Sequence, residues 1–182
     1  MKKIALASIL AITTFAASAA SYVSVDVENV RGLEGASNST AQYIRAGTEL
    51  GGIQYGLQGR TAKLDGGGLL SSVEVTAAKN SFNLKGITPF VGVGHDNGFN
   101  GGASYNYGLV GATYGLPVGP GFLLTGIKTR VGSTEAVNTK QTVGFATYSI
   151  PVAKNVAFNL NASRSGQDIK EEAFGVGLSF GF

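Results

Sequence analysis

The chain has 182 residues, no cysteine and a formal net charge of +3, and only 14% of its residues are charged. Lys2 and Lys3 stand in an N-terminal segment that has no acid, so the remainder is close to +1, with 12 basic and 11 acidic residues. That balance is too weak to favour nucleic acid as a partner. The absence of cysteine excludes a disulfide scaffold and a thiolate metal site.

Residues 1–20 have the features of a cleavable signal peptide. Two lysines precede a mainly apolar stretch at 4–15, and the small residues at 16–20 offer a cleavage site before Ala20 or Ser21. The alternative is a membrane anchor, but the apolar stretch is shorter than the ~18 to 20 residues that a spanning helix needs. We therefore expect residues 21–182 to form a single exported domain, and the absence of cysteine excludes a lipoprotein.

Apolar and polar residues alternate with a period of two along the rest of the chain, which predicts β-strands. In chain order, the apolar faces are Val23, Val25 and Val27; Ile44, Ala46, Thr48 and Leu50; Ile53, Tyr55 and Leu57; Val73, Val75 and Ala77; Leu123, Thr125 and Ile127; Val156, Phe158, Leu160 and Ala162; and Phe174, Val176, Leu178, Phe180 and Phe182. In 103–116 two registers are open, with either Tyr105, Tyr107 and Leu109 or Val110, Ala112 and Tyr114 on the apolar face.

Two kinds of break separate these segments, and they alternate along the chain. One kind is short and, apart from the glycine pair at 51–52, contains proline, at 86–89, 117–121 and 150–154. The other kind is polar, glycine-rich and free of proline, at 32–40, 65–68, 96–102, 132–138 and 165–168. Such alternation is typical of an up-and-down antiparallel barrel with tight turns at one rim and looser loops at the other.

The segments predict an all-β fold, a closed antiparallel up-and-down transmembrane β-barrel of about ten strands, with eight as the alternative. Their length is close to the ~9 to 11 residues that a tilted strand needs to cross a bilayer. Lipid offers no hydrogen-bond partner to an open sheet edge, so the first and last strands must pair. An even number of strands places both termini at the rim with the tight turns, which is periplasmic in outer-membrane barrels.

A soluble barrel would share this periodicity but would place its apolar face inside. The composition of the other face distinguishes the two. A solvent-exposed face carries roughly a quarter to a third charged residues. The polar face of the last strand is instead Ala173, Gly175, Gly177, Ser179 and Gly181. This favours a membrane barrel in which small residues face a lumen, and the glycines suggest that some of its volume is unfilled.

The chain resembles the small outer-membrane β-barrel, porin-like proteins of Gram-negative bacteria. The resemblance rests on the Met-Lys-Lys leader, the segment at 87–94 that opens a strand, and the terminal segment at 173–182 that ends on phenylalanine. It implies a place in the cell outer membrane after export through the periplasm, with membrane lipid as a partner. It also implies that the barrel-assembly machinery reads Phe180 and Phe182 in the last strand. Many small members of the family have eight strands.

The charged residues of the polar faces are the candidate lumen-lining site: Asp26, Glu28, Arg45, Glu49, Arg60, Glu74, Lys128 and Arg130. If they line a narrow aqueous path, the protein is a channel for passive diffusion of ions or very small solutes. If they form ion pairs that fill the interior, it is a structural or surface-interaction barrel with a plugged lumen. The sequence favours the channel slightly, and it does not indicate the oligomeric state.

His95 is the only histidine, and no enzyme is expected. A histidine base needs a nucleophile or metal partner, and His95 stands at the start of a glycine-rich loop. The chain lacks the His–Ser motif of lipid A deacylase barrels and the paired aspartates of omptin-type proteases. The sequence therefore predicts neither a catalytic site, nor a cofactor, nor a metal site.

Overall fold

The computed structural model describes residues 21–34, 38–65, 68–79, 86–97, 104–133 and 138–182. The ten strands are β1 (Tyr22–Gly32), β2 (Ser39–Leu50), β3 (Ile53–Leu64), β4 (Leu69–Lys79), β5 (Ile87–Asp96), β6 (Tyr105–Val118), β7 (Gly121–Ser133), β8 (Asn138–Ala153), β9 (Val156–Gln167) and β10 (Glu171–Gly181). Over these residues no helix is long and apolar enough to cross a membrane. The predicted leader lies outside the described residues and stays a prediction.

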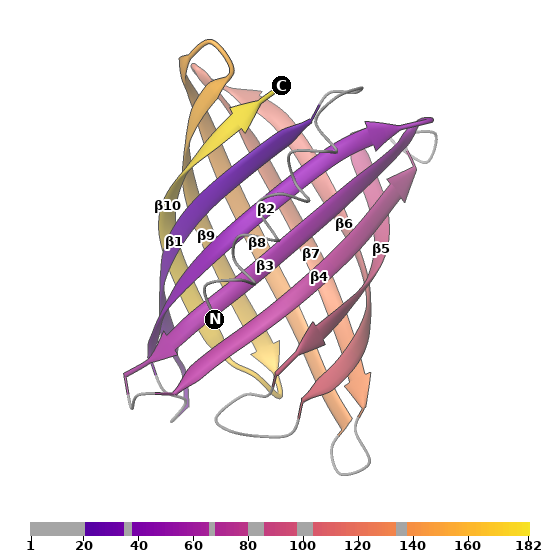
Figure 1. The fold of residues 1–182 in the computed structure, drawn as a ribbon, viewed down its shortest axis with the longest axis vertical. Helices are drawn as coiled ribbons and strands as arrows, with labels where there is room; N and C mark the ends of the chain where they lie inside the picture. Colours follow the sequence, from indigo (N-terminus) through magenta and orange to yellow (C-terminus); the bar gives the residue numbers. More distant parts are fainter. Residues whose placement is uncertain (1–20, 35–37, 66–67, 80–85, 98–103, 134–137) are drawn as a thin grey trace, which may run out of the picture.

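Each strand pairs antiparallel with its neighbours in sequence, and β1 pairs with β10 to close the barrel (Figure 1). The predicted count of ten strands is therefore confirmed over the alternative of eight. The closing register runs from Tyr22 opposite Gly181 to Gly32 opposite Glu171. Both ends of the described chain lie at one rim, beside the turns that join β2 to β3, β6 to β7 and β8 to β9. We call this the turn rim and the opposite end the loop rim.

Several turns follow directly from local chemistry. Gly51 and Gly52 both have positive φ, of 61° and 76°, which is the geometry of a two-residue hairpin turn matched to strand twist. Asn155 has a φ of 61° in the turn between β8 and β9, a conformation that asparagine tolerates better than most residues. Pro89 and Pro151 lie within β5 and β8 and not in turns, and a register irregularity follows Pro151.

The outer face of the barrel is apolar over its middle. Val25, Val27, Val75, Val93 and Val176 are all between 46% and 64% exposed. In the segment at 103–116, Val110 and Tyr114 face outward, whereas Tyr107 and Leu109 are each only 4% exposed and face the lumen. The second of the two registers left open by the sequence is therefore the observed one, and the outer face is continuous across β6.

A charged side chain on this face should destabilise the barrel more the closer it lies to the middle of the bilayer. Val176→Arg places arginine near the middle of β10, opposite Val27, and we expect a loss of ~2 to 4 kcal/mol in the free energy of unfolding from lipid vesicles. The control is Asn29→Arg, which is also exposed but lies nearer the loop rim and should cost ~0 to 1 kcal/mol. Equal losses in urea titrations of the two variants would contradict the assigned lipid face.

Candidate functional site

The candidate site is the lumen. All eight charged residues singled out by the sequence line one cavity of about 930 Å³. Glu49 and Gln54 line it on β2 and β3 near the turn rim, and Arg60 and Arg130 line it farther toward the loop rim. We call this cavity the vestibule. The structure therefore brings together side chains from β1, β2, β3, β4 and β7 that are far apart in the sequence.

Asp26, Glu28 and Arg45 form what we call the acidic cluster, on β1 and β2. Arg45 bonds Asp26 Oδ2 through Nη1 at 2.6 Å and Glu28 Oε1 through Nη2 at 2.9 Å. Its Nε donates to Gln58 Oε1 at 3.0 Å, and its guanidinium lies over the Tyr43 ring. Two carboxylates and one guanidinium give a net charge of −1, and the carboxylates are only 1% and 5% exposed.

Glu74, Lys128 and Arg130 form the basic cluster, which spans the lumen from β4 to β7. Glu74 Oε1 accepts a bond of 2.6 Å from Lys128 Nζ, and Glu74 Oε2 accepts one of 2.7 Å from Arg130 Nη2. Arg130 also donates to Gln141 and lies over the Tyr107 ring. Two cations share one carboxylate, so this cluster carries +1. The clusters thus have opposite net charges.

The other candidate residues are less tightly paired. Arg60 approaches Glu171 at 3.8 Å, and its Nε is the one buried side-chain nitrogen or oxygen without a hydrogen-bond partner among the described residues. Glu49 lines the vestibule. Phe180 lies on the outer face of β10 and Phe182 directly follows the strand, at 39% and 63% exposure, and their reading by the assembly machinery stays a prediction.

Sequence reasoning missed several residues that complete the clusters. Tyr43, Gln58 and Gln141 contact the arginines, Asn161 donates to Asp26 Oδ1 at 2.9 Å, and Glu171 pairs with Arg60. Tyr43, Gln58 and Asn161 share the polar faces of their strands, so alternation alone could have included them. Asn161 and Asp26 are 135 residues apart, and only closure of the barrel brings them together.

The lumen keeps open volume, as the glycines suggested, but many inward glycines lie under larger neighbouring side chains and not beside empty space. A Cβ at Gly94 would overlap the Tyr107 ring, one at Gly111 would overlap Phe90, and one at Gly126 would overlap Phe145. In each pair the aromatic residue stands directly opposite the glycine on the neighbouring strand. On β10, Cβ atoms at Gly175 and Gly177 would overlap the side chains of Glu28 and Asp26. These glycines therefore accommodate larger neighbours against the inner wall.

A buried apolar cluster lies at the loop-rim end of one side of the barrel. Val30, Ala41, Ala62, Leu64, Leu70 and Ala173 form an apolar cluster at the loop-rim ends of five strands, with Tyr43 packed against it. We call it the apolar plug. Val30, Ala41 and Ala62 are 1%, 0% and 0% exposed, so water does not reach them. The vestibule extends from the turn side past this cluster to Gln141, Ser165 and Glu171 on the other strands.

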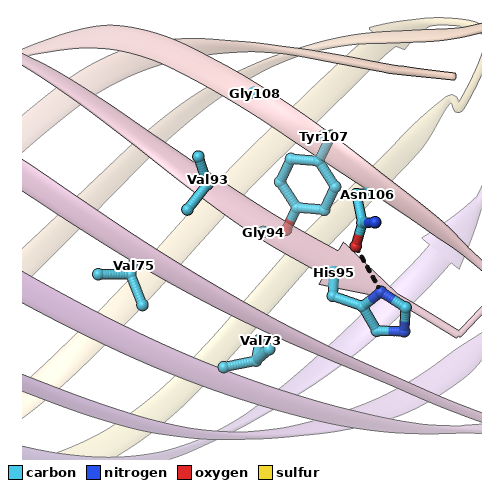
Figure 2. Close-up of a pocket in the computed structure, with 8 residues that line it drawn as sticks. All are labelled: Val73, Val75, Val93, Gly94, His95, Asn106, Tyr107 and Gly108. Carbon is cyan, nitrogen blue, oxygen red and sulfur yellow. Dashed lines mark hydrogen bonds between the residues drawn. The ribbon is translucent and has the colours of Figure 1, made fainter.

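His95 lies away from this site. It is the penultimate residue of β5 and not the first residue of a loop, and its exposed ring bonds Asn106 Oδ1 through Nδ1 at 2.8 Å. It borders a hollow of about 570 Å³ on the outer face, walled by Val73, Val75 and Val93 (Figure 2). Among the described residues, no group of three or more histidine, aspartate or glutamate side chains could hold a metal ion.

Comparisons with known proteins identify the fold but no family. No family model matches the sequence, and no curated protein matches it. The structure is similar to the translocator domain of the autotransporter NalP from Neisseria meningitidis, with a TM-score of 0.52 and 11% identity over 100% of this chain and 96% of that one. Neisserial surface protein A has a TM-score of 0.44 and 12% identity over 90% and 96%.

The N-terminal β-barrel domain of Pseudomonas aeruginosa OprF has a TM-score of 0.36 and 13% identity over 88% of this chain and 97% of that one. The likeness to the NalP translocator domain, at 11% identity, concerns the fold alone. The chain therefore has the fold of outer-membrane β-barrels, which confirms the fold that the terminal strand and the alternating segments predicted.

The glycine–aromatic pairs can be tested by a double-mutant cycle. Gly94→Ala should destabilise the barrel by ~1 to 3 kcal/mol because the added methyl overpacks against Tyr107. In a Tyr107→Ala background the same change should cost little, because the three atoms nearest to that methyl all belong to Tyr107. Equal costs in the two backgrounds, measured by equilibrium unfolding, would show that the ring does not occupy the space beside Gly94.

The basic cluster should depend strongly on Glu74. Glu74→Gln leaves Lys128 and Arg130 together without their shared counter-charge, and we expect a loss of ~3 to 5 kcal/mol in unfolding free energy. The double variant Glu74→Gln/Lys128→Met should recover part of that loss. The matched control is Glu172→Gln, whose partner Arg164 is 75% exposed, so it should cost under ~1 kcal/mol. Similar losses for Glu74→Gln and the control would contradict the assigned pairing.

Proposed function

We propose that the protein is an outer-membrane β-barrel whose lumen is closed toward the loop rim, so that it does not conduct and presents a one-sided vestibule. The observation that carries this is the apolar plug, whose Val30, Ala41 and Ala62 are inaccessible to water. The basic cluster supports it, because Glu74 on β4 meets Lys128 and Arg130 on β7 inside the lumen. The plugged lumen is the alternative that the sequence favoured less.

The membrane location follows from the same geometry. Apolar side chains cover the outside of the barrel, and most of the charged side chains lie inside it, which is the reverse of a soluble barrel. As part of the proposal, residues 1–20 direct export through the periplasm, the assembly machinery reads Phe180 and Phe182, and lipid surrounds the outer face. The vestibule then opens to the periplasm, since tight turns face that side in outer-membrane barrels.

The proposal contains no catalytic step. The exposed His95 ring is bonded to an asparagine side chain at the outer edge of β5. Several tyrosines and carboxylates of the lumen are engaged with cations, such as Tyr107 beneath Arg130 and Glu74 bonded to Lys128. These contacts serve packing and charge neutralisation.

A narrow porin-like channel for ions or very small solutes is the second candidate. The observation in its favour is the vestibule itself, a cavity of about 930 Å³ lined by charged side chains. For this function the contacts around Tyr43 and Tyr107 would have to open, because both rings lie beside the arginines of the two clusters.

Planar-bilayer recording separates the two candidates. We expect no discrete conductance steps from the purified barrel, and steps from the double variant Tyr43→Ser/Tyr107→Ser, which removes two lumen rings. The control is Tyr55→Ser/Tyr114→Ser, whose tyrosines are 41% and 44% exposed on the outer face and which should remain silent. Regular steps from the unaltered protein would overturn the plug and support the channel.

A further inference from the structure

The vestibule has two chemically different walls. On β5, β7 and β8 it is lined by Phe90, Phe122, Leu124, Val143 and Phe145, and on β8 and β9 by Thr147, Ser149, Asn159 and Asn161. Its volume of about 930 Å³ lies within the ~300 to 1,000 Å³ typical of small-molecule sites, which are mostly apolar with a few polar anchors. The vestibule therefore has the size and composition of a binding site.

The hydroxyls and amides of the polar wall bond one another. Thr147 Oγ1 donates to Asn161 Oδ1 at 2.8 Å, and Ser149 Oγ donates to Asn159 Oδ1 at 2.9 Å. Asn161 Nδ2 in turn donates to Asp26 Oδ1 at 2.9 Å. A ligand on this wall would have to break existing bonds, so the wall gives little net attraction.

In the basic cluster, the ammonium group of Lys128 has hydrogen-bond donors that its bond to Glu74 does not use. Lys128 has three N–H donors, of which the bond to Glu74 Oε1 uses one, and its side chain is 11% exposed to the vestibule. Arg130 is committed to Glu74 and Gln141. The cluster carries a net charge of +1, so the free donors of Lys128 favour an anion.

Aromatic rings lie on β5 and β8, to either side of Lys128 on β7. Lys128 stands opposite Gly111 on β6 and opposite Val143 on β8. The Phe90 ring covers Gly111 from the other side, and Phe145 covers Gly126, two residues before Lys128 on the same strand. A cationic donor and two aromatic rings thus share one part of the inner wall.

We propose that the vestibule binds a small organic anion with an aromatic body, such as an aryl carboxylate, with the carboxylate on Lys128 and the ring against Phe90 and Phe145. The acidic cluster does not offer a competing site for cations, because Asp26 and Glu28 are only 1% and 5% exposed and already bonded to Arg45. This binding goes beyond the proposed plug: conductance tests the plug and ligand affinity tests the site, so either can fail alone.

The test uses the purified barrel in nanodiscs of zwitterionic lipid, with benzoate as the probe and saturation-transfer NMR titration as the measurement. Benzylamine has the same ring with a positive charge, and acetate has the carboxylate without the ring. We expect benzoate to bind with at least ~10-fold higher affinity than either, because only benzoate uses both the charge-assisted bond and the ring contacts.

Variants then locate the site. Lys128→Gln should weaken benzoate binding about tenfold or more, while Lys128→Arg, which keeps the charge, should retain most of it. Lys140→Gln on the exposed outer face is the matched control and should leave affinity unchanged. If Lys128→Gln fails to fold, Phe145→Leu provides the second variant and should weaken benzoate more than acetate. No benzoate binding, equal binding of benzylamine, or unchanged affinity in Lys128→Gln or Phe145→Leu would overturn the proposal.

Discussion

Pairing of the first strand with the last is the constraint on which the rest of the structure depends. In lipid, an unpaired strand edge leaves N–H and C=O groups without partners, at several kcal/mol each. β1 and β10 pair along their whole length, from Tyr22 to Gly32. The same pairing requires the small inward residues of β10, because Asp26 and Glu28 on β1 occupy the space beside Gly177 and Gly175. The pairing of β1 with β10 thus both closes the barrel and makes room for the carboxylates of the acidic cluster.

The filling of the lumen follows from this closed wall. Once the strands form a ring, charged side chains that face inward are removed from bulk water and must find partners across the interior. Glu74 on β4 does so with Lys128 and Arg130 on β7, two strands that are not neighbours in the sheet. The aromatic rings reduce the remaining space by lying over glycines on adjacent strands. Ion pairs and rings together fill part of the lumen and leave the vestibule between them.

Sequence periodicity predicted the strands, their faces and the barrel because all three depend on alternation along one segment. Contacts across the lumen depend instead on register and diameter, which no single segment encodes: Glu74 and Lys128 are 54 residues apart. The glycines could not be interpreted fully from the sequence for the same reason. A glycine such as Gly126 looks like empty space until the register places Phe145 opposite it. The orientation of Tyr107 was likewise open, since both registers of its segment alternate equally well.

The buried apolar cluster near the loop rim and the charged vestibule make different parts of the lumen chemically distinct. The acidic cluster has both carboxylates buried, whereas the basic cluster has an ammonium group that still reaches the vestibule. The same wall of the vestibule carries aromatic rings, and the opposite wall has its hydrogen bonds already made. An exposed ammonium group and aromatic rings on one wall are the basis of the proposed preference for aromatic anions over other small solutes.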